Sequence, residues 1–392
     1  MDASFFIAGR LRFKGRIAMV CIAVSFLVMI VAVSVSSGFR NEVRNGLSSL
    51  SGDVRITPPD QNVLDEGSPI EASAAYLPYV ESVEGVDEIV PVIYRAGIVR
   101  GGGNIHGVLF KGFPGSRSGQ NDSIALAVSI PRRLASVLGI GEGDRLSAYF
   151  VGETVKARMF NVVSVYDSAL ETDDRLVVHA SSDDLRRLNG WDADMVSALE
   201  VMLDPSRRNE RGIRDAAEEI GALINAYSSD DEASVIAVSS VSSYPELYGW
   251  LDMIDFNVMF ILILMTVVAG FNMISGLLIM LFENISVIGL LKALGMTDRA
   301  IAKVFLSSSA VLTAKGMAIG NALAIIFCLV QSSTHLLRLD PENYFVSHVP
   351  VHLDPVLVLS ADAVAFAAIM LLLLIPCLFI SKVDPAETVR MK

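Results

Sequence analysis

Residues 271–306 read FNMISGLLIMLFENISVIGLLKALGMTDRAIAKVFL, and they place one short segment of mixed character between two long apolar runs. Within that segment, four apolar residues recur at the spacing of a single helix face: Ile285, Ile288, Leu291 and Leu294. Gly295 suits the C-terminal end of such a helix, and Thr297 or Asp298 suits the start of the next one. Because a helix this short is marginal by itself, we expect it to be stabilised by packing against another surface.

The apolar runs on either side belong to a set of four, each long enough to cross a bilayer, which takes roughly 20 apolar residues. Hydrophobic residues make up 52% of the chain, which is too apolar for an ordinary soluble protein of this length. We predict membrane spans at residues 17–38, 256–281, 301–331 and 355–380. Residues 39–252 have the mixed composition of a water-soluble domain. The predicted fold is therefore a membrane protein with four transmembrane helices and a large extracytoplasmic α+β domain between the first two.

Basic residues predict the orientation of the chain. Four of them precede the first span, three surround the linker between the second and third spans, and three lie in the tail, residues 381–392. In the loop at residues 332–354, Arg338 is the one basic residue, beside several acidic ones. Since lysine and arginine collect on the cytoplasmic side, both termini and the linker at 283–297 are predicted to be cytoplasmic. Residues 1–16 resemble an amphipathic segment lying in the inner interface.

The large domain carries the chain's negative charge, with 19 Lys and Arg against 32 Asp and Glu in residues 40–250. This sign argues against nucleic acid as a partner. The three cysteines all lie in predicted spans, so the domain must fold without disulfides. We find no phosphate-binding loop, no nucleophile motif and no histidine–cysteine cluster, and therefore expect a non-enzymatic chain without a cofactor of its own.

Periodicity predicts several elements within this domain. Strand-like sequence flanks residues 101–103, three consecutive glycines that favour a hairpin turn. Residues 206–227 have helical periodicity, with an apolar face made of Ile213, Ala217, Ile220 and Ile224. Mixed blocks of strands and helices indicate an α+β domain in two lobes.

Polar and small residues inside the predicted spans are further candidates. Gly316 and Gly320 form a G-x-x-x-G pattern, which lets two helices approach closely. Lys315 precedes them, and a lysine in a span costs roughly 3 kcal/mol on insertion scales. It either faces protein, water or a partner, or it reaches the interface because the helix lies deeper or is broken. Asn272 is expected to form an interhelical hydrogen bond, and Pro376 to kink the fourth span.

Residues 271–306 resemble the signature of the FtsX/MacB-type permeases of ABC transporters. In that family the corresponding segment is the cytoplasmic coupling helix, which sits in a groove of the ATPase subunit. Ile288 lies on its apolar face, and Val287 replaces a second glutamate of the pattern, which puts one polar contact in doubt. The positions that match are Glu283, Gly289, Leu291, Lys292, Ala293, Leu294, Gly295 and Thr297.

The resemblance extends along the chain. Pro376, Pro385, Glu387 and Arg390 match the ending of the family, and SVSSGFRNEVRNGL at residues 34–47 is similar to the lipoprotein-releasing, LolC/LolE-like branch. This implies an inner-membrane permease with a MacB-like periplasmic domain and a second permease subunit, either the same chain or a paralogue. It also implies a separate pair of ATPase subunits that bind ATP and Mg. The client would be a lipoprotein or another lipid-anchored molecule, released from the inner membrane by mechanotransmission, and membrane lipids would be further partners.

One departure concerns the hook with which Lol-type permeases recruit a soluble carrier. The corresponding connection, Tyr149 to Phe160, is too short for it and predicts a plain hairpin. Three other functions stay open: an FtsX-type regulator of cell-wall hydrolases, a MacB-like exporter of peptides or antibiotics, and a membrane-anchored sensor or adhesion domain without an ATPase.

Overall fold

The computed structural model describes residues 16–64, 67, 69–114, 126–152, 154–168, 176–340, 344 and 346–377. The chain divides into two compact units, which we name the helical unit and the sheet unit. The helical unit comprises Met1–Asn41, Leu251–Arg338 and His348–Lys392, and the sheet unit comprises Glu42–Trp250 and Leu339–Ser347. The predicted interfacial segment before Arg16, the tail at 381–392 and the last three residues of the fourth predicted span lie outside the described residues.

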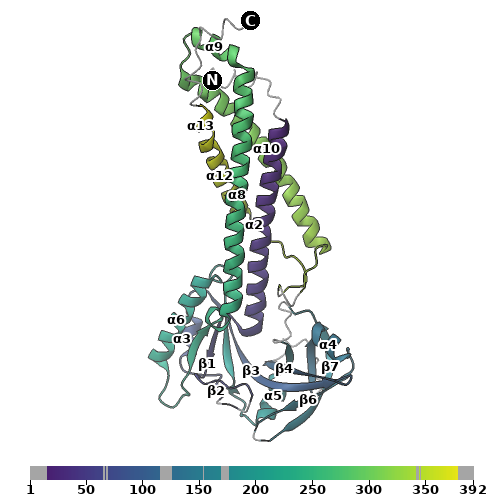
Figure 1. Cartoon of the computed structure of the whole chain (residues 1–392). Coiled ribbons are helices and arrows are strands. Elements are labelled where there is room, and N and C mark those ends of the chain that lie inside the picture. The colour runs from purple at the N-terminus through teal and green to yellow at the C-terminus, as the bar shows by residue number, and fades with distance from the viewer. Residues whose placement is uncertain are drawn as a thin grey trace. The chain divides into compact units, whose positions relative to one another are not determined.

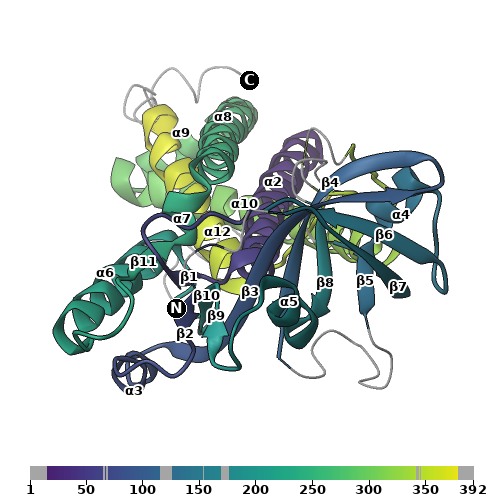
Figure 2. The same ribbon diagram turned by 90° about the horizontal axis from the view of Figure 1, so that it is seen from below.

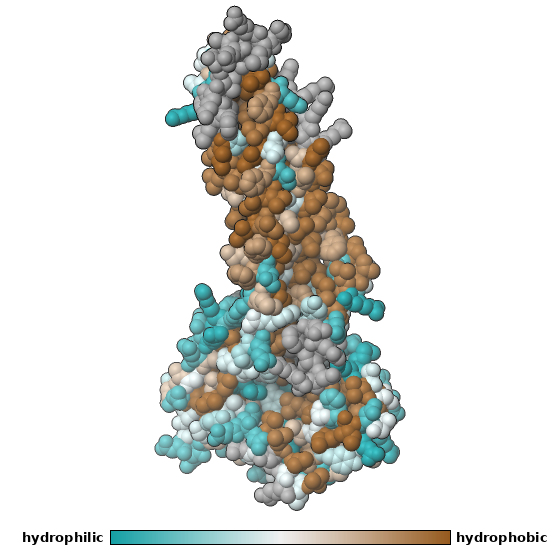
Figure 3. Space-filling view, in the orientation of Figure 1, coloured by the Kyte–Doolittle hydropathy of each residue, from teal (hydrophilic) through white to brown (hydrophobic). Residues whose placement is uncertain are grey.

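Four helices long and apolar enough to cross a membrane lie among the described residues (Figure 1). On the face shown in Figure 3 the helical unit is predominantly hydrophobic, whereas the sheet unit carries hydrophilic and hydrophobic residues side by side. The predicted fold class, four transmembrane helices with a large domain between the first and second, is confirmed. The helices are α2 (Arg16–Ser51), α8 (Pro245–Glu283), α10 (Asp298–Thr334), and α12 (Pro355–Leu372) with α13 (Leu374–Cys377).

Two of these helices are longer than a membrane span requires. At 1.5 Å per residue, the 36 residues of α2 and the 39 of α8 extend for roughly 55 Å, against about 30 Å of hydrocarbon. Both cross the boundary between the units without a break, since α2 ends at Ser51 and α8 begins at Pro245. The fourth span is interrupted instead. Its helix α12 ends at Leu372. In a continuous helix the Leu372 carbonyl would accept a hydrogen bond from the N–H of residue 376, but that residue is Pro376, which has no N–H.

The core of the helical unit draws on every span. Phe26 of α2, Met273 of α8, Phe305 of α10 and Ile369 of α12 are all buried in one cluster. Ile288, from the short linker helix, is buried in the same cluster. The interior therefore connects the linker helix to all four spans.

The sheet unit contains a nine-stranded sheet in the order β11-β1-β10-β3-β4-β8-β5-β7-β6. A further pairing, of Ile98–Arg100 in β3 with Ser147–Tyr149 in β6, closes the strands from β3 to β6 into a ring (Figure 2). The strands are β1 (Val54–Thr57), β3 (Val86–Gly101), β4 (Asn104–Phe113), β5 (Ala127–Pro131), β6 (Arg145–Phe150), β7 (Lys156–Tyr166), β8 (Val177–Ser181), β10 (Ala198–Leu203) and β11 (Ile236–Ser239); β2 (Ile70–Glu71) and β9 (Met195–Val196) form a separate pair.

Aromatic side chains fill the ring. The ring centroid of Phe110 lies 5.0 Å from that of Phe150 and 5.2 Å from that of Phe160. A side chain at Gly97 would meet both Phe150 and Phe110, so Gly97 also faces inward. Because strand residues alternate between the two faces, Ala96 and Ile98 must face outward from the ring.

Short helices cover the remaining strands. The helix predicted in residues 206–227 is α6 (Glu210–Tyr227), and its predicted apolar face is buried. The predicted hairpin joins β3 and β4 at Gly101–Asn104, where Gly102 and Gly103 have positive φ. The other short helices of the sheet unit are α3 (Leu77–Glu81), α4 (Arg132–Leu138), α5 (Ser182–Asn189) and α7 (Ser240–Ser243).

Candidate functional site

The linker between the second and third spans is built around α9 (Ile285–Ala293). After the C-cap Leu294, Gly295 adopts the left-handed conformation with φ +87°. Its N–H donates to the Lys292 carbonyl, and the Met296 N–H donates to the Leu291 carbonyl at 3.0 Å. These two bonds form a Schellman motif, which satisfies carbonyls that the helix itself leaves free. Glycine is required at 295 because a side chain would strain this conformation.

A second cap begins the helix that follows. The Thr297 hydroxyl accepts a hydrogen bond from the Ala300 N–H at the start of α10. Lys292 Nζ lies 2.9 Å from Asp298 Oδ1 and so bridges the end of α9 to the first turn of α10. The turn between the two helices is therefore held by a glycine, a hydroxyl cap and an ion pair.

The candidate coupling residues divide between the two faces of α9. Ile288 and Gly289 are buried and Leu291 packs against the core of the helical unit. Glu283, Ala293 and Gly295 are exposed, as is Leu294 at 76%. Leu290, which lies beside the family positions, is 56% exposed. The helix thus presents apolar side chains both to its own core and outward, and contact of the outward face with an ATPase stays a prediction.

Gly316 and Gly320 place α10 against α2. A Cβ on Gly320 would lie 2.4 Å from the Ala23 carbonyl oxygen, and one on Gly316 would lie 2.9 Å from Ile22 Cβ. Only glycine permits this separation of the two backbones. The same face of α10 is lined by small and short polar residues, all of them buried: Ser309, Thr313, Ala324 and Cys328.

The other intramembrane candidates have weaker contacts. Lys315 is exposed on the surface of the helical unit, and its contact with water, lipid or a partner stays a prediction. Asn272 is half-buried, and its side chain makes no hydrogen bond with the described residues. Pro376 is buried in α13.

A polar pair that was not predicted from the sequence joins the third and fourth spans. Asn321 Nδ2 donates to Asp362 Oδ2 at 2.5 Å, joining α10 to α12. Asp362 is buried although it lies inside a span. An acid within an apolar run was the available signal, since intramembrane carboxylates almost always face protein or water.

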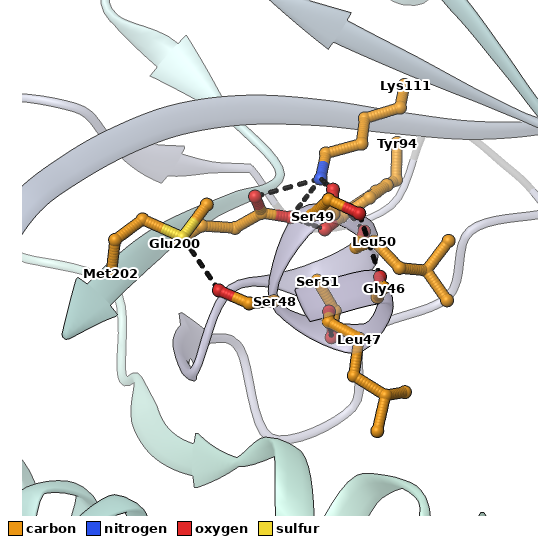
Figure 4. A network of polar contacts seen from close by, with 10 residues as sticks. All are labelled: Gly46, Leu47, Ser48, Ser49, Leu50, Ser51, Tyr94, Lys111, Glu200 and Met202. Carbon is orange, nitrogen blue, oxygen red and sulfur yellow. Dashed lines mark hydrogen bonds and ion pairs between the residues drawn. The ribbon is translucent and has the colours of Figure 1, made fainter. Parts of the chain in front are cut away.

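A larger network, also missed, lies where α2 ends in the sheet unit (Figure 4). The last carbonyls of a helix have no partner within it. Here the Gly52 N–H donates to the Ser48 carbonyl, and Lys111 Nζ donates to the carbonyls of Ser49 at 3.0 Å and Leu50 at 2.8 Å. A lysine on β4 therefore caps the end of α2.

The third donor of the Lys111 ammonium is directed to Glu200 of β10, with Nζ 2.8 Å from Oε1. The Tyr94 hydroxyl donates to the same carboxylate. Both Lys111 and Glu200 have side chains that are 0% exposed. Burial lowers the pKa of Lys111 and raises that of Glu200, while the attraction between the two opposes both shifts. The network joins the end of α2 to three strands: β3, β4 and β10.

A charged residue at the centre of an apolar strand was the signal for this network. Lys111 interrupts VLFKGF and Glu200 interrupts ALEVML, at positions where a strand buried on both faces would be apolar. Their pairing could not be read from sequence because 89 residues separate them.

The connection between β6 and β7 is a short hairpin. The two strands pair up to Phe150 and Lys156, which leaves residues 151–155 for the turn. Val151 and Val155 are exposed, and Glu153 lies outside the described residues. The plain hairpin predicted between Tyr149 and Phe160 is confirmed.

Comparison with known proteins gives the same assignment as the sequence patterns. Residues 259–385, which include α9, match the family described as FtsX-like permease C-terminal. The lipoprotein-releasing system transmembrane protein LolC of Neisseria meningitidis serogroup B is 20% identical, over 97% of this chain and 95% of that protein. LolC of Xylella fastidiosa is 22% identical over the same shares.

Among solved structures, the periplasmic region of MacB from Actinobacillus actinomycetemcomitans is 10% identical, with a TM-score of 0.32 over 52% of this chain and 95% of that one. The family match covers the second to fourth spans with the linker helix, and the LolC similarity extends over nearly the entire chain. Residues 259–385 thus match an FtsX-like permease domain, and nearly the whole chain is similar to the transmembrane proteins of lipoprotein-releasing systems.

Proposed function

We propose that this chain is the permease subunit of an ABC transporter that releases lipoproteins from the inner membrane. ATP and Mg would be bound by a separate pair of ATPase subunits, and a second permease subunit would complete the assembly. The similarity to LolC over 97% of the chain supports the class of client. The single observation that carries the coupling role is the apolar, outward-facing side of α9.

Docking of the ATPase is assigned to that outward face. Val287 and Leu290 are exposed there, on a helix of only nine residues, and Leu294 is exposed at its C-cap. A helix-in-groove contact uses apolar anchors at this spacing. Because the opposite face is packed in the core and the turn from α9 to α10 is capped, a push on α9 would be transmitted to the spans rather than absorbed by the linker.

Transmission beyond the membrane would use α2 and α8, which are continuous from the helical unit into the sheet unit. In this proposal closure of the ATPase subunits shifts the spans, and the shift reaches the sheet unit through the capped end of α2. The client is expelled by this motion, without a hydrophilic pore.

The proposal places the sheet unit in the periplasm and both termini in the cytoplasm. Lys292, Arg299 and Lys303 around the linker support this orientation. A reporter enzyme fused after Lys392 should be active only as a cytoplasmic fusion. A periplasmic C-terminus would contradict the four-span topology proposed here.

The coupling role can be tested at Leu290 and Leu294. The double variant Leu290→Asp, Leu294→Asp adds two carboxylates to the outward face, where each would be desolvated in a groove without a partner. We expect the ATPase that copurifies with the tagged wild-type chain to be lost, while the variant still inserts in the membrane. Gly289 and Leu291 are less suitable positions, because they face the protein's own core.

Leu336→Asp provides the matched control, since Leu336 is 74% exposed at the opposite end of α10. It should leave copurification unchanged. Release of a lipoprotein from proteoliposomes, measured with ATP, should be lost in the double variant and kept in the control. If the double variant retains both the ATPase and release, α9 is a lipid-facing helix and the proposed coupling is wrong.

A further inference from the structure

A cavity of about 730 Å³ lies within the sheet unit. Sites for small ligands typically measure about 300–1,000 Å³. Its walls come from the end of α2, the loop after β1, and the outward faces of β3, β4 and β6; they include Leu50, Leu64, Ile98, Leu109 and Tyr149. Strand positions that face away from a filled ring are normally polar. Here they are apolar, which favours an apolar ligand.

One cationic side chain, Arg55 of β1, also lines the cavity. Its Nε is buried and makes no hydrogen bond with the described residues. Its guanidinium lies 5.8 Å from the centre of the Tyr94 ring, and across the strands Arg55 pairs with Glu200.

The carboxylate of Glu200 is already bonded to Lys111 and Tyr94. The Lys111–Glu200 pair contributes no net charge, whether it is ionised or neutral. Glu200 attracts Arg55 as well as Lys111, so among the described residues these three groups leave one net positive charge at this end of the cavity. Guanidinium groups form their strongest hydrogen bonds with anionic oxygens.

We propose that this cavity binds a long-chain fatty acid from the membrane. The acyl chain would lie against Ile98, Leu109 and Tyr149, and the carboxylate would pair with the guanidinium of Arg55. The source is the bilayer that the four spans of this chain occupy. This site is separate from the proposed coupling helix and requires neither an ATPase nor a client.

Ligand at this site would contact the chain where it leaves the sheet unit for the spans. Leu50 and Ser51 are the last residues of α2, and Ser243 and Tyr244 immediately precede α8; all four line the cavity. Leu50 also supplies one of the carbonyls that Lys111 caps. A bound acyl chain would therefore touch the capped helix end directly.

The test uses the full-length chain in phosphatidylcholine vesicles without an ATPase. A diazirine-bearing fatty acid is compared with the fatty alcohol of the same chain length and diazirine position. After irradiation, labelled peptides are mapped by mass spectrometry. We expect the acid to label residues 96–98 and 149–151, and the alcohol to label them at least about tenfold less at equal concentration, because a hydrogen bond between charged groups is lost.

Two variants have matched controls at exposed positions of the same sheet. Arg55→Met should reduce labelling by the acid to the level of the alcohol, whereas Arg100→Met, at an exposed position on β3, should not. Ile98→Asp should abolish labelling by both probes. Ile105→Asp, at an exposed isoleucine on β4 outside the cavity, should leave it unchanged. Tryptophan fluorescence checks that each variant is folded.

Several results would overturn the proposal: no label in these residues, equal labelling of the wild type by acid and alcohol, or full labelling of Arg55→Met. A triacylated lipopeptide tests the other occupant. If it displaces the label at lower concentration than unlabelled fatty acid does, the site holds the acyl chain of a client instead. Loss of ATPase copurification would leave all these results untouched, so this proposal and the proposed function fail separately.

Discussion

Replacing Lys111 with methionine should destabilise the sheet unit far more than a single buried hydrogen bond would suggest. Lys111→Met keeps the approximate length and volume of the side chain but removes its charge and three donors. Glu200 is then left as a fully buried carboxylate whose one remaining hydrogen bond with the described residues comes from the Tyr94 hydroxyl, and the carbonyls of Ser49 and Leu50 lose their cap. Removing one partner of a buried ion pair typically costs about 3–5 kcal/mol.

The double variant Lys111→Met, Glu200→Leu should recover much of that loss. With both charges gone, neither position 111 nor position 200 holds an unpaired buried charge, and such replacements are often neutral. What remains is two uncapped carbonyls and a tyrosine hydroxyl without its acceptor, which we expect to cost about 1–3 kcal/mol. Adding Tyr94→Phe removes the last of these groups and should restore stability further. The coupling free energy between positions 111 and 200 should therefore be at least about 2 kcal/mol.

Urea unfolding of the full-length chain in detergent measures these free energies. Both tryptophans, Trp191 and Trp250, lie in the sheet unit, so their fluorescence reports that unit alone. The release assay then gives a second readout, because a helix end without its cap should transmit less motion even where stability has been recovered. The proposed role of the network is wrong if Lys111→Met lowers the free energy of unfolding by less than about 1 kcal/mol, or if the double variant is no more stable than the single one.

Three further predictions concern other parts of the chain. Gly320→Ala should lower thermal stability in detergent by about 1–3 kcal/mol, because its Cβ would overlap the Ala23 carbonyl, whereas Gly249→Ala, which has open space on α8, should be neutral or stabilising. The pKa of His179 is lowered to about 4 by burial and by the charge of Lys111. As the pH falls, the imidazole is therefore protonated in the unfolded chain before it is protonated in the folded one. Stability should be complete above pH 6.5 and decrease towards pH 4, with a loss of about 2 kcal/mol between pH 7.5 and 5 that disappears in His179→Phe; a flat urea midpoint over this range would contradict it. Photocrosslinkers at Val151 and Val155 should capture no soluble carrier in cells, because the turn at residues 151–155 is too short for a hook; efficient capture from either position would show that the hairpin recruits one.

Local patterns in the sequence predicted the local structure well. The four apolar runs, the glycine hairpin at residues 101–103 and the apolar face of α6 each depend on neighbours in the chain, and each is present. The closure of the ring was not predictable in this way. Ile98–Arg100 meets Ser147–Tyr149 from almost fifty positions away, and nothing in either segment names its partner.

The candidate site shows a second limit, which is specific to membrane proteins. In a soluble helix the apolar face is the buried face, so periodicity identifies the core. In α9 both faces are apolar: Ile288 and Leu291 pack inward, and Leu290 and Leu294 point outward. Sequence spacing grouped Leu291 with Leu294, although the structure places them on different surfaces.

The division of α9 between two faces bears on how such a short helix could transmit force. A helix that met an ATPase groove with its only apolar face would have to leave its own membrane domain to do so. Here the inward face is retained by the core that includes Phe26, Phe305 and Ile369, while the outward face stays available. In the proposed function, docking of an ATPase on the outward face would therefore break no contacts within the helical unit. Any displacement of α9 would also displace the core against which it packs. The same principle applies at the other end of α2, where Lys111 joins the helix end to three strands. In the proposed function, each end of the path from ATPase to client is a fixed contact, and motion is left to the spans between them.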